Sequence, residues 1–329
     1  MHLPDFGFQA PQTLEELLGL KEEAGDSALV LAGGTDLVVR LKQRLAHPST
    51  ILSIRDVAEL KKIEADPIHL RIGAGVSLAS IMSHDSIRDE FPGLVQAVAA
   101  IGHPSCQHHS ATLGGNLLLE PRCLYYNQSA FWRKGHERCL KTGGQVCLVN
   151  PEAKDCSSAN RSDGATMLTA YSALVKLVSA RGERLIPVSE LFTGKGEAPF
   201  SLLEDEVLAE IRLPRPAGRV KAGYFKLAVR GALDFPLTSA AAVAHLSGEK
   251  VDRVRLVLSG CGPAPLVVDE ADRILRGQRA APELLEEAAE AAGRVGGGGI
   301  VENAGTEAEY LRRMVVVAAR RALKKALKV

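Results

Sequence analysis

The chain has 329 residues, of which 46% are hydrophobic and 24% are charged, and its formal net charge is +1. This composition is typical of a soluble globular protein with two or three packed lobes, and the small net charge gives no electrostatic reason to expect nucleic-acid binding. The sequence has no secretory signal and no run of about 18 apolar residues that would cross a bilayer. We therefore expect a cytoplasmic protein, in whose reducing surroundings clustered cysteines act as ligands or redox groups.

The first hundred residues predict short strands and helices in succession. Thr13 and Glu16 form a capping-box pattern, which predicts that a helix begins near residue 14. An apolar run at 28–31 predicts a strand. The stretch 78–100 predicts two helices, separated at Pro92 because proline and the glycine after it interrupt a helical pattern.

The last third of the chain predicts a second structural unit. Proline and glycine at 214–218 indicate a boundary, and two strand-like runs follow at 240–246 and 254–258. Two helices then flank four consecutive glycines at 296–299, and 307–328 predicts an amphipathic helix. Strands and helices that do not strictly alternate favour an α+β fold over a doubly wound sheet.

Residues 32–37 form a glycine-rich motif, AGGTDL, directly after the strand at 28–31. Glycines let backbone N–H groups approach a phosphate, and successive N–H groups form an anion-binding nest. The motif is neither the dinucleotide fingerprint G-x-G-x-x-G nor a P-loop. A phosphate site and a plain tight turn both remain open for this motif alone.

A second motif, ATLGGNL at 111–117, repeats the same chemistry with a hydroxyl, two glycines and an amide. Two such loops from distant parts of the chain could hold a pyrophosphate between them, although two unrelated turns would look the same. The segment just before it contains His103, Cys106, His108 and His109. We interpret these as ordinary polar loop residues, because local histidines are more often that than metal ligands.

Four of the six cysteines lie in one polar stretch at 120–162, which has little periodicity and predicts an irregular insertion. They are Cys123, Cys139, Cys147 and Cys156. Their spacing fits neither the common zinc pairs nor the bacterial ferredoxin run. A zinc site, an iron–sulfur site and free buried thiols all remain compatible with the residues alone.

The two glycine motifs resemble the FAD pyrophosphate loops of the medium, flavin-binding subunits of molybdenum hydroxylases, the family of xanthine dehydrogenase and CO dehydrogenase. The likeness continues through Tyr224-Phe225-Lys226 and 234–237 to the helix around 310–313. It implies a two-lobed FAD-binding domain of the vanillyl-alcohol-oxidase type, followed by a smaller α+β domain. The implied ranges are 1–217, with lobes 1–56 and 57–217 and an insertion at 120–162, and then 218–329.

The resemblance also implies which residues bind FAD, and it implies no catalytic residue in this chain. The expected cofactor-binding residues are Val30, Leu31, Ala32, Gly33, Gly34, Thr35, Asp36, Leu37, Thr112, Leu113, Gly114, Gly115, Asn116, Asp163, Leu208 and Lys226.

The insertion itself, with RCLYYNQS at 122–129 and Trp132-Arg133, resembles that of the β subunit of 4-hydroxybenzoyl-CoA reductase. In that enzyme the insertion carries an extra 4Fe–4S cluster. The resemblance therefore implies that Cys123, Cys139, Cys147 and Cys156 are cluster ligands. It favours iron–sulfur over zinc.

By the same resemblance, the chain is an electron-relay subunit of a larger oxidoreductase. Ferredoxin would supply electrons to the 4Fe–4S cluster, and FAD would connect it to a small 2Fe–2S subunit and a large molybdopterin subunit, in a dimer of heterotrimers. The closest alternative is the FAD subunit of a xanthine-, aldehyde- or nicotinate-type hydroxylase that passes electrons to NAD or quinone. A flavin- or zinc-stabilised scaffold without enzymatic function is a second alternative.

Overall fold

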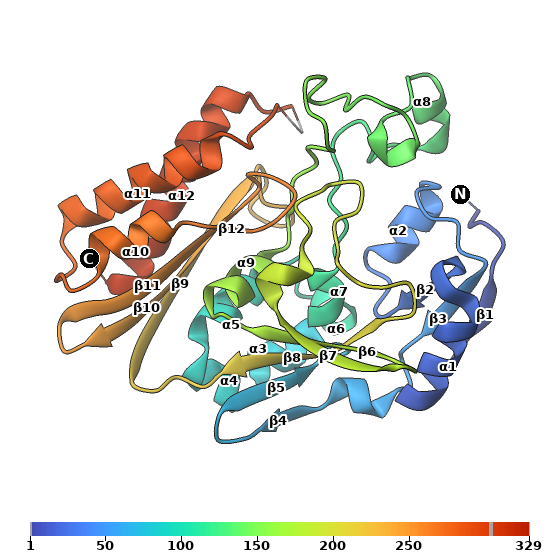
Figure 1. The fold of residues 1–329 in the computed structure, drawn as a ribbon, viewed down its shortest axis with the longest axis horizontal. Coiled ribbons are helices and arrows are strands. Elements are labelled where there is room, and N and C mark those ends of the chain that lie inside the picture. The colour runs from blue at the N-terminus through green and yellow to red at the C-terminus, as the bar shows by residue number, and fades with distance from the viewer. Residues whose placement is uncertain (1, 303–304, 329) are drawn as a thin grey trace.

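The computed structural model describes residues 2–302 and 305–328 and contains three separate sheets (Figure 1). The N-terminal lobe is built on a parallel three-stranded sheet in the order β1-β3-β2, in which apolar side chains pack against two helices. Its elements are β1 (Gly7–Gln9), α1 (Leu14–Ala24), β2 (Ala28–Leu31), α2 (Leu37–Lys42) and β3 (Thr50–Ser53). The helix predicted near residue 14 is confirmed, and the Thr13 hydroxyl accepts the Glu16 N–H at its start.

The second lobe is an antiparallel five-stranded sheet covered by short helices, with the largest hydrophobic cluster between the two layers. The strands, in sheet order, are β4 (Ile63–Ala65), β5 (His69–Gly73), β8 (Val207–Pro214), β6 (Leu174–Ser179) and β7 (Gly182–Pro187). The helices are α3 (Leu78–Ser83), α4 (Asp85–Glu90), α5 (Pro92–Ala99), α6 (Gln107–Ser110), α7 (Leu113–Leu117) and α9 (Asp163–Ala170). Short 3-10 turns cover Gly25–Ser27, Ala58–Lys61, Leu140–Thr142 and Val188–Leu191.

The prediction of two helices over 78–100 was wrong, because the structure has three. His84 adopts an extended backbone conformation, with φ −77° and ψ 122°, and this separates α3 from α4. Pro92 does mark the next break, since it is the first residue of α5. Proline suits that position because its missing N–H would have no helical partner there.

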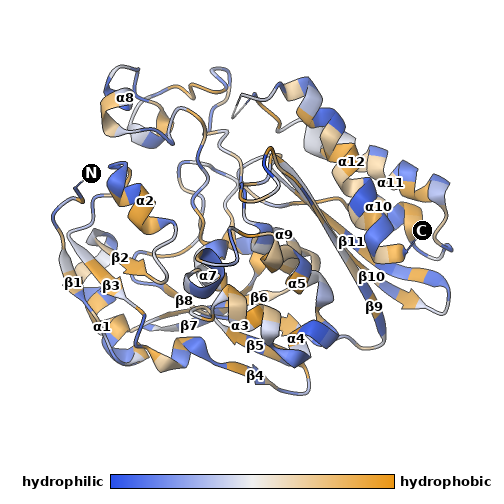
Figure 2. Ribbon diagram, turned by 180° about the vertical axis from the view of Figure 1, so that it is seen from behind, coloured by the Kyte–Doolittle hydropathy of each residue, from blue (hydrophilic) through white to orange (hydrophobic). Residues whose placement is uncertain are grey.

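The C-terminal unit is an antiparallel four-stranded sheet with three helices on one face (Figure 1). Figure 2 shows hydrophobic and hydrophilic residues interspersed along α11 and α12, as expected for helices that bury one face. The strands are β9 (Arg219–Leu227), β10 (Thr238–Ser247), β11 (Lys250–Ser259) and β12 (Leu266–Val267); the helices are α10 (Asp269–Leu275), α11 (Pro282–Gly297) and α12 (Ala308–Leu327). The α+β fold is thus confirmed.

The four glycines at 296–299 do not simply separate two helices, because α11 continues through Gly297. Packing explains the glycine at 296. A Cβ atom there would lie 3.0 Å from side-chain atoms of Leu258 and Val315 and 3.2 Å from the Cys261 sulfur. The helix therefore needs a residue without a side chain to lie this close to the sheet.

The segment 120–162 is an irregular excursion, drawn in green above α2 and containing only α8 (Ala130–Lys134) and one 3-10 turn (Figure 1). None of its residues belongs to the four hydrophobic clusters formed by the described residues. The prediction of an irregular insertion without a hydrophobic core is confirmed. Within 2–302 and 305–328, no helix is long and apolar enough to span a membrane.

Candidate functional site

The first glycine loop joins β2 to α2 and presents free backbone donors. Gly34 has φ +74°, a conformation that glycine adopts without strain. Within the described part of the chain, the N–H groups of Gly33, Gly34 and Thr35 have no hydrogen-bond partner. Three consecutive unpaired N–H groups before a short helix form a nest that suits an anion.

This loop lies against the segment that precedes the second glycine motif. A Cβ atom at Gly33 would lie only 1.6 Å from the Ser110 carbonyl oxygen, so the two backbones are in direct contact. A cleft of about 540 Å³ opens between them. It is lined by Gly33, Gly34, Thr35, Val38, His103, Cys106, Gln107, Ser110 and Leu233. The histidine-containing segment, for which the sequence indicated no specific role, thus forms one wall of the cleft.

The backbone N–H groups of the second glycine motif are paired within the protein, unlike those of the first loop. The N–H of Leu113 donates to the Val76 carbonyl at 3.1 Å, and the N–H of Gly114 donates to the Ala74 carbonyl at 3.0 Å. The Gly115 N–H donates to the Thr112 hydroxyl at 3.1 Å. Because these donors are already paired, we expect this motif to act through its side chains and its close packing rather than as a second nest.

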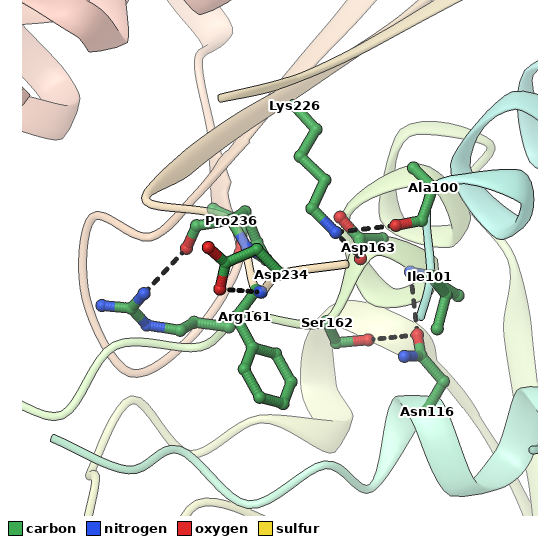
Figure 3. A network of polar contacts seen from close by, with 12 residues as sticks. Ala100, Ile101, Asn116, Arg161, Ser162, Asp163, Lys226, Asp234 and Pro236 are labelled. Carbon is green, nitrogen blue, oxygen red and sulfur yellow. Dashed lines mark hydrogen bonds and ion pairs between the residues drawn. The ribbon is translucent and has the colours of Figure 1, made fainter. Parts of the chain in front are cut away.

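Asn116 of the second motif connects it to the start of α9 (Figure 3). Its Oδ1 accepts hydrogen bonds from the Ser162 hydroxyl at 2.8 Å and from the Gly164 N–H at 2.9 Å. The predicted residues Asn116 and Asp163, which lie far apart in the sequence, are therefore brought to one place.

Asp163 is only 3% exposed, and its carboxylate is hydrogen-bonded to two side chains of β9. One carboxylate oxygen accepts a hydrogen bond from the Tyr224 hydroxyl, and the other accepts one from Lys226 Nζ at 3.1 Å. Lys226 also donates to the Ala100 carbonyl at 2.7 Å (Figure 3). Burial raises the pKa of Asp163 above its usual value, although the Lys226 charge acts in the opposite direction.

Tyr224 is a residue that the site prediction missed. Burial and the neighbouring Asp163 carboxylate raise its pKa well above the usual value, so it remains a hydrogen-bond donor. A signal was present in the sequence, since Tyr224 and Lys226 are two residues apart on a strand and so point to the same side. Leu208, by contrast, lies in β8 within the largest hydrophobic cluster and is not among the residues that line the cleft.

Two cysteines of the insertion, Cys123 and Cys156, have raised pKa values, to which neighbouring cysteines contribute. Burial raises the pKa of Cys123, and the charges of Cys156 and Cys139 contribute in the same direction. Burial likewise raises the pKa of Cys156, with a contribution from Cys147. Among the described residues, no group of three or more His, Cys, Asp or Glu side chains is arranged to hold a metal ion.

Hydrogen-bond donors surround two of these sulfur atoms. The Tyr126 N–H donates to Cys123 Sγ at 3.4 Å, and the Thr142 hydroxyl donates to Cys139 Sγ at 3.6 Å. Three of the four thiols are buried, at 7% exposure for Cys123, 4% for Cys147 and 6% for Cys156. Of the three buried thiols, Cys123 accepts a hydrogen bond, whereas Cys156 donates one to the Ser158 hydroxyl at 3.2 Å.

A set of buried charges between the insertion and α2 was also missed from the sequence. Arg122 forms an ion pair with Asp36, and Glu120 lies between Arg40, at 2.7 Å, and Lys141, at 2.8 Å. These residues connect the loop that carries Cys123 to the first glycine loop. No local pattern predicts them, because the partners lie in distant parts of the chain.

The two-lobed architecture, with an anion-binding glycine loop beside a cleft, defines a nucleotide-cofactor-binding subunit. Residues 4–216 match the family described as FAD binding domain in molybdopterin dehydrogenase, and residues 223–326 match the CO dehydrogenase flavoprotein C-terminal domain. The chain therefore belongs to the FAD-binding subunits of the molybdopterin dehydrogenases, and it is an oxidoreductase subunit of the molybdenum hydroxylase family.

Individual relatives agree with this assignment. The chain is 27% identical over 287 residues to the nicotinate dehydrogenase FAD-subunit of Eubacterium barkeri, covering 86% of this chain and 84% of that protein. It is 26% identical to the xanthine dehydrogenase FAD-binding subunit of Escherichia coli O157:H7, covering 79% and 76%. A chain of carbon monoxide dehydrogenase from Hydrogenophaga pseudoflava superposes with a TM-score of 0.80 at 25% identity, covering 100% of this chain and 99% of that one.

Proposed function

We propose that this chain is the FAD- and iron–sulfur-carrying subunit of a molybdenum-containing complex of the 4-hydroxybenzoyl-CoA reductase type. The feature that carries the proposal is the insertion, which contains four cysteines, three of them buried, and is joined to the first glycine loop by the ion pair between Arg122 and Asp36. The family membership supports FAD, and the insertion supports the additional cluster.

The residues around the first glycine loop fit FAD. The unpaired N–H groups of residues 33–35 suit its diphosphate, which would lie at the start of α2. Arg40 Nε is buried without a hydrogen-bond partner among the described residues, and an anionic cofactor supplies the kind of partner it lacks. We assign the remaining contacts to the second motif and to Asp163 with Lys226, as the resemblance implies.

Four thiols in one irregular insertion suit a four-sulfur site. Among the described residues, no group of three or more His, Cys, Asp or Glu side chains is arranged to hold a metal ion. It is therefore the resemblance of the insertion, and not the arrangement of the thiols, that favours a 4Fe–4S cluster over zinc. The raised pKa values of Cys123 and Cys156 mean that these thiols are neutral when free, so ligation would release protons.

When bound, FAD supplies one- and two-electron transfer and a 4Fe–4S cluster supplies one-electron transfer. The chain's own residues would hold the two groups in one rigid unit and keep water from the buried thiols. The proposed partners are a large molybdopterin subunit, a small 2Fe–2S subunit and ferredoxin, in a dimer of heterotrimers.

A second candidate function is that of the FAD subunit in a different kind of molybdenum enzyme. The relatives include proteins named as subunits of nicotinate, xanthine and caffeine dehydrogenases, which favours an oxidative hydroxylase that passes electrons outward to NAD or quinone. The insertion is the feature that favours the reductase instead.

The test is to purify the chain with the subunits that accompany it and to assay both directions of chemistry. The proposal predicts that the complex removes the phenolic hydroxyl of 4-hydroxybenzoyl-CoA when supplied with reduced ferredoxin. Oxidation of purines, aldehydes or nicotinate without that activity would establish the second candidate.

A further inference from the structure

The insertion is attached to both ends of α2. At the N-terminal end, Arg122 pairs with Asp36, and their side chains are only 8% and 22% exposed. Arg122 directly precedes Cys123, and Asp36 directly follows Thr35 of the glycine loop. Cys123 and Thr35 are therefore each the immediate sequence neighbour of a residue in this ion pair.

At the C-terminal end of α2, Arg133 of α8 makes the corresponding contact. Its guanidinium donates to the carbonyl of Gln43 at 3.2 Å and to the carbonyl of Arg44 at 2.7 Å. Gln43 is the C-cap residue of α2, and Arg44 is the first residue beyond it. Helix α2 is only six residues long, so these contacts at its two ends add to the packing of Leu37 and Leu41 against the parallel sheet.

Glu120 strengthens the attachment from the middle. It lies between Arg40 of α2 and Lys141, and Lys141 also donates to the Pro121 carbonyl at 2.6 Å. Lys141 Nζ also lies 4.8 Å from the centre of the Tyr126 ring. This lysine therefore contacts residues both before and after Cys123. The Lys141 side chain is only 2% exposed, so its ammonium depends on the acceptor oxygens at Glu120 and Pro121.

We propose that Arg122 and Glu120 are positioning residues that couple the two cofactor sites, so that a cluster bound by the cysteines strengthens FAD binding and FAD strengthens cluster binding. This inference rests on the proposed function. Ordering the insertion by one cofactor fixes α2 and the glycine loop, so the second cofactor has less conformational entropy to lose. The coupling must be equal in both directions.

The experiment uses the full chain after removal of FAD and iron. The dissociation constant of FAD is measured by flavin fluorescence, before and after reconstitution with iron and sulfide. We expect FAD to bind about tenfold more tightly to the reconstituted chain, a typical coupling between two sites. Conversely, FAD should slow the loss of iron to a chelator.

Substitutions at Arg122 and Glu120 test whether these two residues carry the coupling. Arg122→Met and Glu120→Gln should each bind both cofactors but lower the tenfold effect to less than about twofold. Arg122→Lys, which keeps the positive charge, should retain part of the increase in FAD affinity. The control is Lys134→Met, which removes an exposed charge from the end of α8 and should leave the coupling unchanged.

The outcomes separate the two hypotheses. If the wild-type chain takes up no iron and sulfide, both the iron–sulfur function and the coupling are wrong. If the cluster forms but FAD affinity does not change, only the coupling is wrong. Should Arg122→Met fail to fold, Glu120→Gln decides, because it preserves the size of the side chain; full coupling in that variant would overturn the assignment.

Discussion

Arg122 and Asp36 form a largely buried ion pair, although they lie 86 residues apart in the sequence. One belongs to the cysteine insertion and the other to the loop that precedes α2. The pair joins the two lobes of the FAD-binding domain and makes the two candidate cofactor sites neighbours. Asp36 is buried enough that its pKa is raised in spite of the nearby Arg122 and Arg40 charges.

The contact between the glycine loop and Ser110 predicts the effect of Gly33→Ala. A Cβ at this position would clash with the Ser110 carbonyl, so the two walls of the cleft must separate. We expect loss of at least about tenfold in FAD affinity, since the loop would no longer present its N–H groups correctly. The measurement is a fluorescence titration with FAD.

The matched control is Gly19→Ala in the exposed part of α1, where a Cβ meets nothing within 4 Å. It should leave FAD affinity unchanged and stabilise the helix by about 0.5–1 kcal/mol. Equal FAD affinity in Gly33→Ala and wild type would show that the loop is not the binding element.

The hydrogen bond from Tyr224 to Asp163 predicts a stability effect. Tyr224→Phe leaves a buried carboxylate without one of its donors, which should lower the free energy of unfolding by about 1–3 kcal/mol. Tyr310→Phe, at a position that is 45% exposed, should change it by less than about 0.5 kcal/mol. Urea unfolding of both variants checks the prediction, and equal midpoints would contradict it.

Asp163 also predicts a dependence on pH. Because burial raises its folded pKa, this carboxyl contributes stability at low pH that is lost as the pH rises through the folded value. The free energy of unfolding of the wild type, relative to Asp163→Asn, should therefore fall as the pH is raised above about 4, the ordinary pKa of an aspartate. A relative stability that rises over this range would mean that the Lys226 charge outweighs burial.

The exposure of the cysteines predicts their reactivity. Burial raises the pKa of Cys261 to about 12, and this residue is 1% exposed, whereas Cys106 is exposed at the cleft. Iodoacetamide at pH 8 should modify Cys106 at least about 100-fold faster than Cys261, since the thiolate is the nucleophile. Mass spectrometry of the native chain measures both rates, and comparable rates would refute the assigned environments.

Local features were predictable from the sequence and long-range ones were not. The cap at Thr13 and the strand that leads into the glycine loop depend on neighbouring residues, and both are present. The contact between Tyr224 and Asp163 spans 61 residues and depends on how the C-terminal sheet packs against α9. The break at His84 was missed because its extended conformation has no strong sequence signal such as proline.

In the candidate site, too, local motifs were predictable from the sequence and long-range contacts were not. Its glycine and cysteine motifs were visible as patterns, while the charges that join them, Arg122 to Asp36 and Glu120 to Arg40, carry no periodicity. Only the fold shows that the first motif offers unpaired N–H groups and that the second has already used its own.

Cofactor analysis of the purified protein shows whether one chain carries both FAD and a four-iron cluster. We expect one FAD and about four iron atoms with a similar amount of acid-labile sulfide per chain. Cys139→Ser should lose the iron and keep the flavin, bound more weakly. Tightly bound zinc without sulfide, or iron that persists in Cys139→Ser, would show that the cysteines do not hold an iron–sulfur cluster.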